Sequence, residues 1–269
     1  MALSMLSPFM SAVNHRALLQ QMVKRELGNR YQGTLLGWLW SLLNPLMMLL
    51  LYTFVFKVIF KARWPDIENS NIEFASVLFI GLLVHGFFAE VLTRSTTIIV
   101  ENKNYVKKVV FPLPVLAWTI TLTALINMLL GFAILLVFMV IMCKTFSFVF
   151  ILFPLVLIPF AMLAVGCCWF LSSLAVYFRD LVLIIPPLST LMLFSSTTFF
   201  PLEKAPALIQ PVLRFNPLTV IIDSIRDLLV YGRLPDMGLL MVYSMVALAA
   251  FWMGHWIFKK LSRGFSDVL

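Results

Sequence analysis

The stretch of the chain from Leu113 to Phe178 contains a single charged residue, Lys144. A transmembrane helix needs about 20 consecutive apolar residues, so this stretch is long enough for two helices that cross a membrane and are joined by a tight turn near Lys144 and Thr145. The composition agrees, because 62% of the 269 residues are hydrophobic and only 12% are charged, about half the charged fraction of an average soluble domain. The sequence therefore predicts an all-α, polytopic membrane protein.

Six apolar segments of spanning length divide the chain. They cover residues 35–60, 74–93, 115–143, 146–177, 181–200 and 237–258. Before them, residues 1–34 place Leu19, Val23 and Leu27 at fourfold spacing with basic side chains opposite, a pattern typical of an amphipathic helix at a membrane interface. A basic tail, residues 259–269, follows the last span. We therefore predict six transmembrane helices preceded by an amphipathic interface helix.

The basic residues predict how these spans are oriented. Six spans place both termini on one side of the membrane, and Lys and Arg are more numerous on that side, because they gather before the first span, between spans two and three, and in the tail. Cytoplasmic loops of membrane proteins carry the excess of Lys and Arg, so we expect both termini in the cytoplasm. This orientation places segment 96–112 inside the cell and segment 201–235 outside it.

Segment 201–235 is too polar to cross a membrane and too apolar to be an ordinary loop. Within it, Asn216 and Pro217 precede an apolar ladder that begins at Leu218, and Gly232 follows that ladder. These residues supply a helix N-cap, a first-turn proline and a C-terminal stop. We therefore predict a helix of about four turns.

This predicted helix has a polar face made by Asp223, Arg226 and Asp227. It is too short to span a bilayer, so it should lie at the membrane surface or dip into it. Residues 206–215 have the same mixed character, which predicts a pair of half-helices between spans five and six. Two interpretations remain open: the half-helices line a gate or pore, or the segment is an extracytoplasmic loop that rests on the headgroups.

Few residues in the predicted spans could carry out chemistry. His85 and Glu90 in span two are the ionisable residues that we place deep in the membrane, and they lie about 140° apart around a helix, so they do not share a face. We expect His85 to be hydrogen-bonded within the bundle and Glu90 to pair with Arg94, four residues later. Catalysis and metal binding need several such groups to converge, so the sequence predicts neither.

The sequence also lacks a motif for binding ATP. A phosphate-binding loop needs two glycines five positions apart, followed by Lys and then Ser or Thr. Gly28 and Gly33 have this spacing, but Thr34 and Leu35 follow them. The chain shows no interleaved basic and aromatic patch for nucleic acid either. We therefore expect this chain to bind no cofactor and no nucleic acid, and a transporter of this design would be driven by a separate subunit.

Four segments of the sequence resemble a known family. They are RYQGTLLGWLWSLLNPLMMLLLYTFVF from residue 30, ENKNYVKKVVFPLPVL from residue 101, YFRDL from residue 177 and NPLTVIIDSIRDLLVYG from residue 216. In this order they resemble the ABC-2 type export permeases, and among these most of all the membrane subunits that export O-antigen and capsular polysaccharide. The resemblance extends from about Arg16 to Phe258.

The resemblance implies a permease in the bacterial inner membrane that moves a lipid-linked polysaccharide. The chain would form a homodimer and carry two cytoplasmic ATPase subunits, which bind the ATP and Mg²⁺. The loop between spans two and three would be a helix that docks on the ATPase, and residues 201–232 would form extracytoplasmic gate helices. The candidate ATPase contacts are Ile99, Glu101, Asn102, Lys103, Lys107 and Lys108.

Aromatic and hydroxyl side chains suit the faces and edges of sugar rings, so those at suitable depth are candidates for a sugar path. The candidates are Trp118, Phe194, Ser195, Ser196, Thr197, Thr198, Phe199, Phe200, Asn216 and Pro217.

Other functions are compatible with the same pattern. A permease of this family could move a drug or another small amphiphile instead of a polymer. A membrane-bound acyltransferase that acts on lipid-linked sugars would depend on His85. A passive scaffold or channel would bind no ATPase.

Overall fold

The structure is a computed structural model that describes residues 7–30, 32–59, 74–108, 111–143 and 148–269. Every regular element in these ranges is helical. The α-helices are α2 (Ser7–Asn14), α3 (Arg16–Asn29), α4 (Trp40–Thr53), α5 (Phe74–Ser95), α6 (Ile98–Glu101), α7 (Lys103–Lys108), α8 (Pro114–Phe138), α9 (Phe153–Tyr177), α10 (Leu181–Phe194), α11 (Gln210–Phe215), α12 (Pro217–Arg226), α13 (Met237–Leu261) and α14 (Phe265–Val268).

Short turns of wider or tighter helix extend and link these elements. The π-helical turns are Phe54–Ile59, Met139–Cys143 and Asp227–Tyr231, and the 3-10 turns are Gly37–Leu39, Phe148–Leu152, Leu202–Lys204 and Ser262–Gly264. The predicted turn at Lys144 and Thr145 lies outside the described residues, as does the predicted end of the first span at residue 60.

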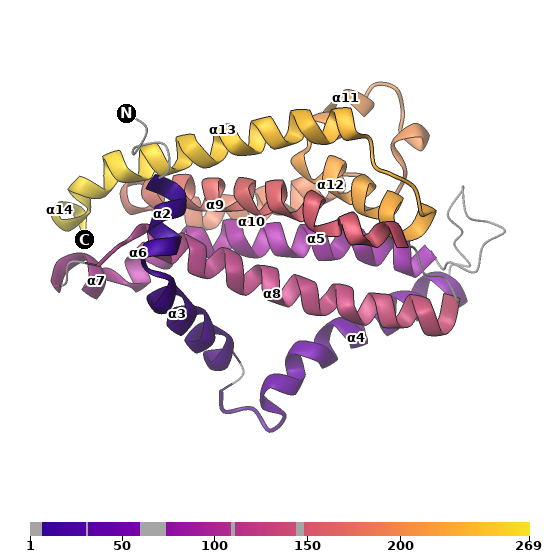
Figure 1. Ribbon diagram of the computed structural model, residues 1–269, viewed down its shortest axis with the longest axis horizontal. Coiled ribbons are helices and arrows are strands. Elements are labelled where there is room, and N and C mark those ends of the chain that lie inside the picture. The colour runs from indigo at the N-terminus through magenta and orange to yellow at the C-terminus, as the bar shows by residue number, and fades with distance from the viewer. Residues whose placement is uncertain (1–6, 31, 60–73, 109–110, 144–147) are drawn as a thin grey trace.

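The long helices form a bundle along the long axis of the molecule. Helices α5, α8, α9, α10 and α13 run in this direction, and α4 crosses below α8 at an angle (Figure 1). The end of the bundle that holds α2, α6, α7, α14 and the C-terminus is called the terminal end below. The short helices α11 and α12 lie toward the opposite end (Figure 1).

Four helical stretches are long and apolar enough to cross a membrane. They are Phe74–Ser95, Pro114–Ile141, Phe148–Tyr177 and Met237–Gly264, which coincide with predicted spans two, three, four and six. Shorter apolar helices occupy the first and fifth predicted spans, at Trp40–Phe56 and Leu181–Phe194. All six predicted spans thus contain an apolar helix, and four of these helices have spanning length.

The predicted bounds of spans one and five are each wrong at one end. Residues 35–39 precede α4 as turns, and Gly37 there has a φ of 50°, which glycine adopts without strain. Helix α10 ends at Phe194 rather than at residue 200. It ends there because hydroxyl side chains follow, and the Ser196 hydroxyl donates to the Leu193 carbonyl instead of allowing the helix to continue.

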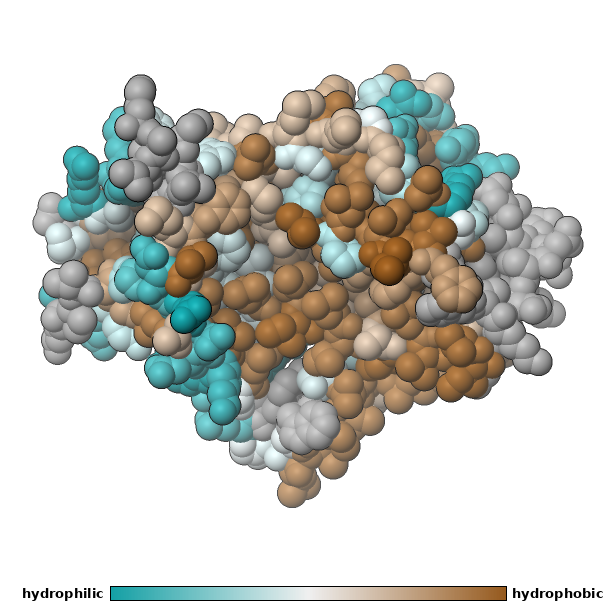
Figure 2. Space-filling model, viewed as in Figure 1, coloured by the Kyte–Doolittle hydropathy of each residue, from teal (hydrophilic) through white to brown (hydrophobic). Residues whose placement is uncertain are grey.

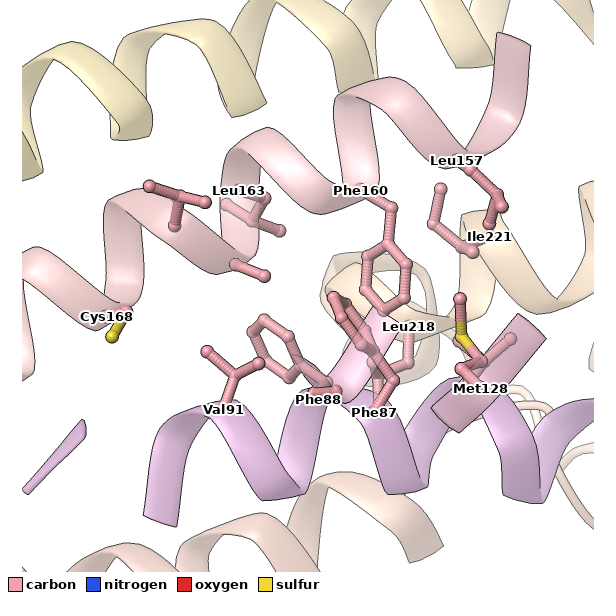
Figure 3. Close-up of a cluster of buried hydrophobic side chains, with 14 of the residues drawn as sticks. Phe87, Phe88, Val91, Met128, Leu157, Phe160, Leu163, Cys168, Leu218 and Ile221 are labelled. Atoms are coloured by element: carbon pink, nitrogen blue, oxygen red, sulfur yellow. The ribbon is translucent and has the colours of Figure 1, made fainter. Parts of the chain in front are cut away.

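The core centres on α5, which packs against α8, α9 and α12. The rings of Phe87 and Phe88 lie 5.0 and 5.8 Å from that of Phe160 on α9, measured between centroids. Leu218 and Ile221 of α12 lie in the same cluster (Figure 3). Close packing is the main force between helices in a membrane, so this cluster fixes α12 within the bundle.

Helices α9 and α13 are in direct backbone contact. Gly166 and Gly254 lie where the two helices meet, and a Cβ atom added to Gly166 would lie 2.6 Å from the Ala250 carbonyl oxygen. Small residues at a helix interface allow two backbones to approach closely in a membrane. Any larger residue at either glycine would push the helices apart.

The outer surface of the bundle is apolar. Figure 2 shows apolar surface over α4 and α8, whereas polar surface follows α3 and gathers in the corner around α11. Large apolar side chains on α4, α10 and α13 are more than half exposed, among them Leu50, Leu191 and Met241. Apolar surface on this scale marks a membrane-facing protein. The chain is therefore a multi-pass membrane protein.

Candidate functional site

The segment between α10 and α13 contains the predicted half-helices, α11 and α12. The Asn216 side-chain oxygen accepts a hydrogen bond from the Leu218 N–H at 2.9 Å, and Pro217 follows at the first helical position. A π-helical turn extends α12 to Tyr231, and Gly232 ends it with a φ of 61°. The predicted N-cap, first-turn proline and glycine stop are confirmed.

Helix α12 lies inside the bundle. Leu218, Ile221 and Ile225 on its apolar face are fully buried, and the helix contacts α5, α9 and α13. The preceding helix α11 is more exposed, since 89% of Phe215 is accessible. Helix α12 is therefore packed within the bundle, whereas α11 lies at its surface.

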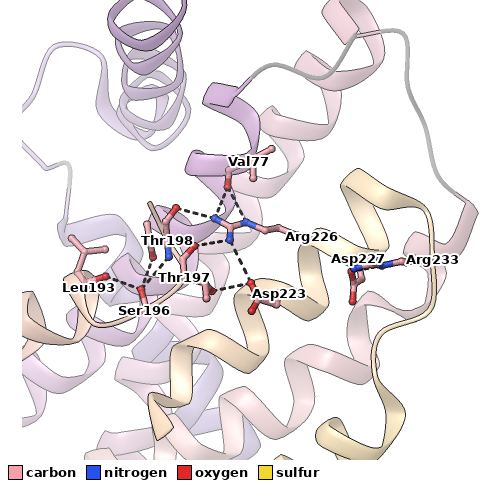
Figure 4. A network of polar contacts seen from close by, with 9 residues as sticks. All are labelled: Val77, Leu193, Ser196, Thr197, Thr198, Asp223, Arg226, Asp227 and Arg233. Carbon is pink, nitrogen blue, oxygen red and sulfur yellow. Dashed lines mark hydrogen bonds and ion pairs between the residues drawn. The ribbon is translucent and has the colours of Figure 1, made fainter. Parts of the chain in front are cut away.

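The prediction that Arg226 belongs to a polar face of α12 is wrong, because its side chain points into the bundle. Its side chain is 2% exposed. Its guanidinium donates to the carbonyl oxygens of Val77, Thr197 and Thr198 at 3.2, 2.6 and 2.8 Å and lies 3.4 Å from Asp223 Oδ1 (Figure 4). Burial lowers the pKa of Arg226 to about 10, so it stays protonated at neutral pH. A buried cation is tolerated when its donors are paired, and these oxygens provide the pairing.

The turn after α10 is the second half of this network. Ser196, Thr197 and Thr198 are fully buried. The Thr197 hydroxyl donates to Asp223 Oδ1 at 2.8 Å, and the Ser196 and Thr198 hydroxyl oxygens are 2.8 Å apart. These hydroxyl groups, chosen as candidates for a sugar path, are thus bonded within the chain in this structure.

Gly81 of α5 allows this turn to sit directly on the helix. A Cβ atom added to Gly81 would lie 3.0 Å from the Thr198 Cα and 2.8 Å from its Cγ2, closer than side-chain contacts normally allow. The Arg226 network therefore joins the first turns of α5, the turn after α10 and helix α12. We call Val77, Ser196, Thr197, Thr198, Asp223 and Arg226 the gate network, after the gate that is one of the two interpretations of this segment predicted from the sequence.

Asn216 attaches the start of α12 to the end of α10. Its side-chain amide donates to the carbonyl oxygens of Met192 and Ser195, both at 2.8 Å, and to the Ser195 hydroxyl at 3.0 Å. The residue is 6% exposed. Asn216 therefore both caps α12 and attaches it to the turn after α10. The capping pattern in the sequence predicts the first role but not the second.

A polar pocket opens beside the gate network. Its volume is about 370 Å³, within the range of small-ligand sites. Its lining residues are Pro201, Leu202, Glu203, Lys204, Asp223, Arg226, Asp227, Tyr231 and Arg233. Carboxylates, basic groups and one aromatic ring are thus available to hydroxyl-rich molecules at this end of the bundle.

The candidate sugar-path residues occupy two places. Those from Phe194 to Pro217 lie around the gate network, where Phe194 stacks on Phe199 with ring centroids 5.4 Å apart. Trp118 instead lies near the start of α8, and its ring contacts those of Trp169 and Phe251.

Segment 96–112 forms the two short helices α6 and α7 at the terminal end. Ile99 is 1% exposed, so it anchors α6 in the core and offers no surface to a partner. Glu101, Lys103 and Lys107 are exposed. The Asn102 amide donates to the Ile98 carbonyl oxygen at 2.9 Å. Lys108 ends α7, and its side chain lies outside the described part of the structure.

Ion pairs attach the amphipathic helix α3 to α5. Arg30 Nη1 lies 2.8 Å from Glu90 Oε1, and Arg94 bonds to Glu26. Arg94 Nη1 also lies 3.7 Å from Glu90 Oε1, which confirms the predicted pairing of Glu90 with Arg94. The partners from α3 were not predicted, because nothing in a single sequence places α3 beside α5.

His85 and His255 both contact other residues of the bundle. His85 Nε2 lies 3.0 Å from the Ser189 carbonyl oxygen, which confirms its predicted hydrogen bond within the bundle. The prediction that His85 and Glu90 are the only deep ionisable residues is wrong, because His255 of α13 is 6% exposed and its ring lies 4.8 Å from that of Trp169. Among the described residues, no group of three His, Cys, Asp or Glu could hold a metal ion.

Comparison with known proteins connects these features to a family. Residues 17–230 match the family model described as "ABC-2 type transporter". The chain is 30% identical over 258 residues to the O-antigen export system permease protein RfbA of Myxococcus xanthus, covering 94% of this chain and 95% of that one. It is 27% identical to RfbA of Klebsiella pneumoniae, covering 94% and 95%. It is 26% identical to the polysialic acid transport protein KpsM of Escherichia coli, covering 87% and 90%. The chain belongs to the ABC-2 type transporter family.

Proposed function

We propose that this chain is the membrane permease subunit of an ATP-driven exporter that carries a lipid-linked O-antigen or capsular polysaccharide across the bacterial inner membrane. The observation that carries the proposal is the 30% identity to an O-antigen export permease over 94% of the chain. Similarity over almost the whole length includes the spans and the short helices between them. A relative that shared only apolar spans would support no particular substrate.

The surface of α6 and α7 supports docking of a separate ATPase subunit in the cytoplasm. Lys103, Lys107 and Glu101 are exposed there, while Ile98 and Ile99 hold α6 in the core. A docking helix needs this combination, because its polar face must meet the partner while its apolar face transmits force to the bundle. In a homodimer, two such surfaces would bind two ATPase subunits, which supply ATP and Mg²⁺.

The gate network supports a closed gate at the extracytoplasmic end. Arg226 bonds to three carbonyl oxygens of other segments, so α12 cannot move alone without leaving buried polar groups unpaired, which is costly. Opening for a polymer would therefore move α12 together with the turn after α10. The adjacent polar pocket would offer hydrogen bonds to sugar hydroxyls as the chain emerges.

The deciding experiment is to delete this chain in its host and measure two pools of polysaccharide. Surface polymer is detected with antibody or lectin, and lipid-linked polymer is extracted from the cytoplasmic membrane. We expect surface polymer to disappear while long lipid-linked chains accumulate inside, because synthesis continues and export stops.

Re-expression of the unchanged chain is the control and should restore surface polymer. If both pools stay unchanged after deletion, the polymer is not the substrate, and export of a small amphiphile by the same family becomes the better proposal. Loss of both pools together would instead indicate a role in synthesis.

A further inference from the structure

An apolar cavity of about 640 Å³ lies between α10 and α13. Its floor is made by Phe88 and Leu92 of α5, and its walls extend along α9 from Leu163 to Leu171 and along α13 from Leu239 to Ala247. At 1.5 Å per residue, each wall is roughly 12 Å long. The cavity volume is within the range of small-ligand sites.

One tyrosine that lines the cavity has a hydroxyl group without a partner among the described residues. Tyr243 is 7% exposed, and its hydroxyl oxygen is fully buried without a hydrogen-bond partner among the described residues. Native proteins pair nearly all buried polar groups. Tyr243 lines the cavity, but its hydroxyl oxygen is shielded from it, so a ligand in the cavity would pair with this oxygen only after the side chain turns toward it.

A basic side chain stands where the cavity meets a second hollow. This hollow, about 380 Å³, is lined by Ala207, Gln210, Pro211, Arg214 and Phe215. Arg214 and Phe215 line both spaces. Arg214 is exposed and has no ion pair in the part of the chain that the structure describes. The combined site thus has an apolar compartment, a tyrosine in its wall and a cation at its mouth.

We propose that this site binds a bilayer phospholipid with an anionic headgroup. One acyl chain fills the cavity, the headgroup phosphate pairs with Arg214, and the Tyr243 side chain turns so that its hydroxyl donates to an ester oxygen. The lipid would hold α10 and α13 at a fixed distance beside the gate network. This inference does not depend on which substrate the permease exports.

The dimensions favour a hydrocarbon chain over a helix of a second copy of this protein. A volume of about 640 Å³ over roughly 12 Å gives a mean cross-section of about 50 Å². A helix 10–12 Å in diameter needs roughly 80 Å² or more, so it could not reach the floor at Phe88. The rim favours a lipid as well, because Leu188 and Val242 are exposed apolar side chains that continue into the membrane-facing surface.

The test uses the full chain in vesicles that contain a phosphatidylglycerol with a photoreactive diazirine in its acyl chain. After illumination, labelled peptides are mapped by mass spectrometry. We expect labels on the inner wall residues of α9 and α13. Val242→Trp should reduce this labelling several-fold, because the new ring occupies the cavity mouth. Met245→Trp is the matched control, since Met245 is 63% exposed on α13, against 53% for Val242, but does not line the cavity.

The headgroup contact has its own test with unlabelled competitors. For the unchanged chain, phosphatidylglycerol should displace the label better than phosphatidylcholine. Arg214→Gln should reduce this preference by about fivefold, which corresponds to about 1 kcal/mol for one basic residue beside anionic lipid, and Arg214→Lys should retain it. Tyr243→Phe should weaken labelling while leaving the headgroup preference intact.

Two results would overturn the proposal. Labels spread evenly over the outer face of α13, unchanged by Val242→Trp, would mean that the cavity holds no lipid. Stronger displacement by a polyprenyl phosphate than by phosphatidylglycerol would assign the cavity to a carrier lipid instead. The first result would leave the proposal of polymer export unchanged, because the deletion experiment measures export separately.

Discussion

Helices α7 and α12 are both short, both lie between apolar helices and both carry basic side chains, yet they use charge in opposite ways. Helix α7 presents Lys103 and Lys107 to the outside, where water or a partner meets them. Helix α12 directs Arg226 inward onto three backbone carbonyl oxygens. The first arrangement leaves charge free for docking, and the second uses charge to hold segments of one chain together. Stability and transport should therefore respond differently to mutations at the two sites.

The largest loss of stability is expected for Arg226→Ala. It leaves the Thr197 and Thr198 carbonyl oxygens without this donor, whereas the Val77 carbonyl oxygen keeps its bond within α5. Each unpaired buried group costs about 1–3 kcal/mol, so the loss should be about 2 kcal/mol or more. Thermal unfolding in detergent, followed by tryptophan fluorescence, measures it. The control is Arg233→Ala, which removes an ion pair with Asp227 from an arginine that is 67% exposed and should cost less than about 1 kcal/mol. Equal shifts for both variants would contradict a special role for Arg226.

A smaller loss is expected for Gly81→Ala. The new Cβ would press on Thr198, and overpacking of this kind costs about 1–3 kcal/mol. Gly86→Ala on the same helix is the matched control, because nothing lies within 4 Å of its added Cβ. That variant should be neutral or stabilise the protein by about 0.5–1 kcal/mol, as expected for replacing a helical glycine by alanine. The same unfolding assay compares them, and similar behaviour of the two would show that Thr198 does not rest on α5.

Removal of the link between α3 and α5 should cost less again. Arg94 pairs with Glu26 and Glu90 while about a third exposed, so Arg94→Ala should destabilise the protein by roughly 1 kcal/mol, the upper end for exposed pairs. Hydrogen exchange should rise mainly in α3. The control is Arg16→Ala, which changes an exposed residue of α3 and should leave hydrogen exchange unchanged. If exchange in α3 rises in both variants, the ion pairs are not what attaches α3 to α5.

The smallest effect on folding is expected for Lys103→Glu combined with Lys107→Glu. Both side chains are exposed, and exposed substitutions usually change stability by less than about 0.5 kcal/mol. Export should nevertheless fall sharply while ATP hydrolysis continues, because the reversed charges no longer fit the ATPase. Lys259→Glu, also an exposed residue near the terminal end, should leave export intact. Normal export by the double variant would contradict the proposal that α7 couples the permease to the ATPase. The difference in how α7 and α12 use charge would then have no functional consequence.

The sequence predicted those features whose causes are local. Apolar runs placed an apolar helix in every predicted span, and the bounds of α12 followed from Asn216, Pro217 and Gly232. These signals need only neighbouring residues. The exposed surface of α7 followed in the same way from its high charge.

The features that were missed depend on contacts between distant segments. The direction of Arg226 could not be predicted, because its partners are backbone carbonyl oxygens, which every residue carries. The end of α10 was placed too late because hydroxyl side chains also occur within membrane helices. His255 was overlooked in a span that is otherwise apolar, although a single histidine in such a span was itself the available signal.

The contact between Gly166 and Gly254 has a mechanical consequence. Because the backbones of α9 and α13 are in close contact there, neither helix can slide past the other without first separating. The two helices should therefore move as one rigid body during transport. Helix α10 contains Pro186 and Pro187, and only Ile185 and Ser189 among its residues are buried. We therefore expect α10 to move relative to α9 and α13, while these two helices keep their relative position.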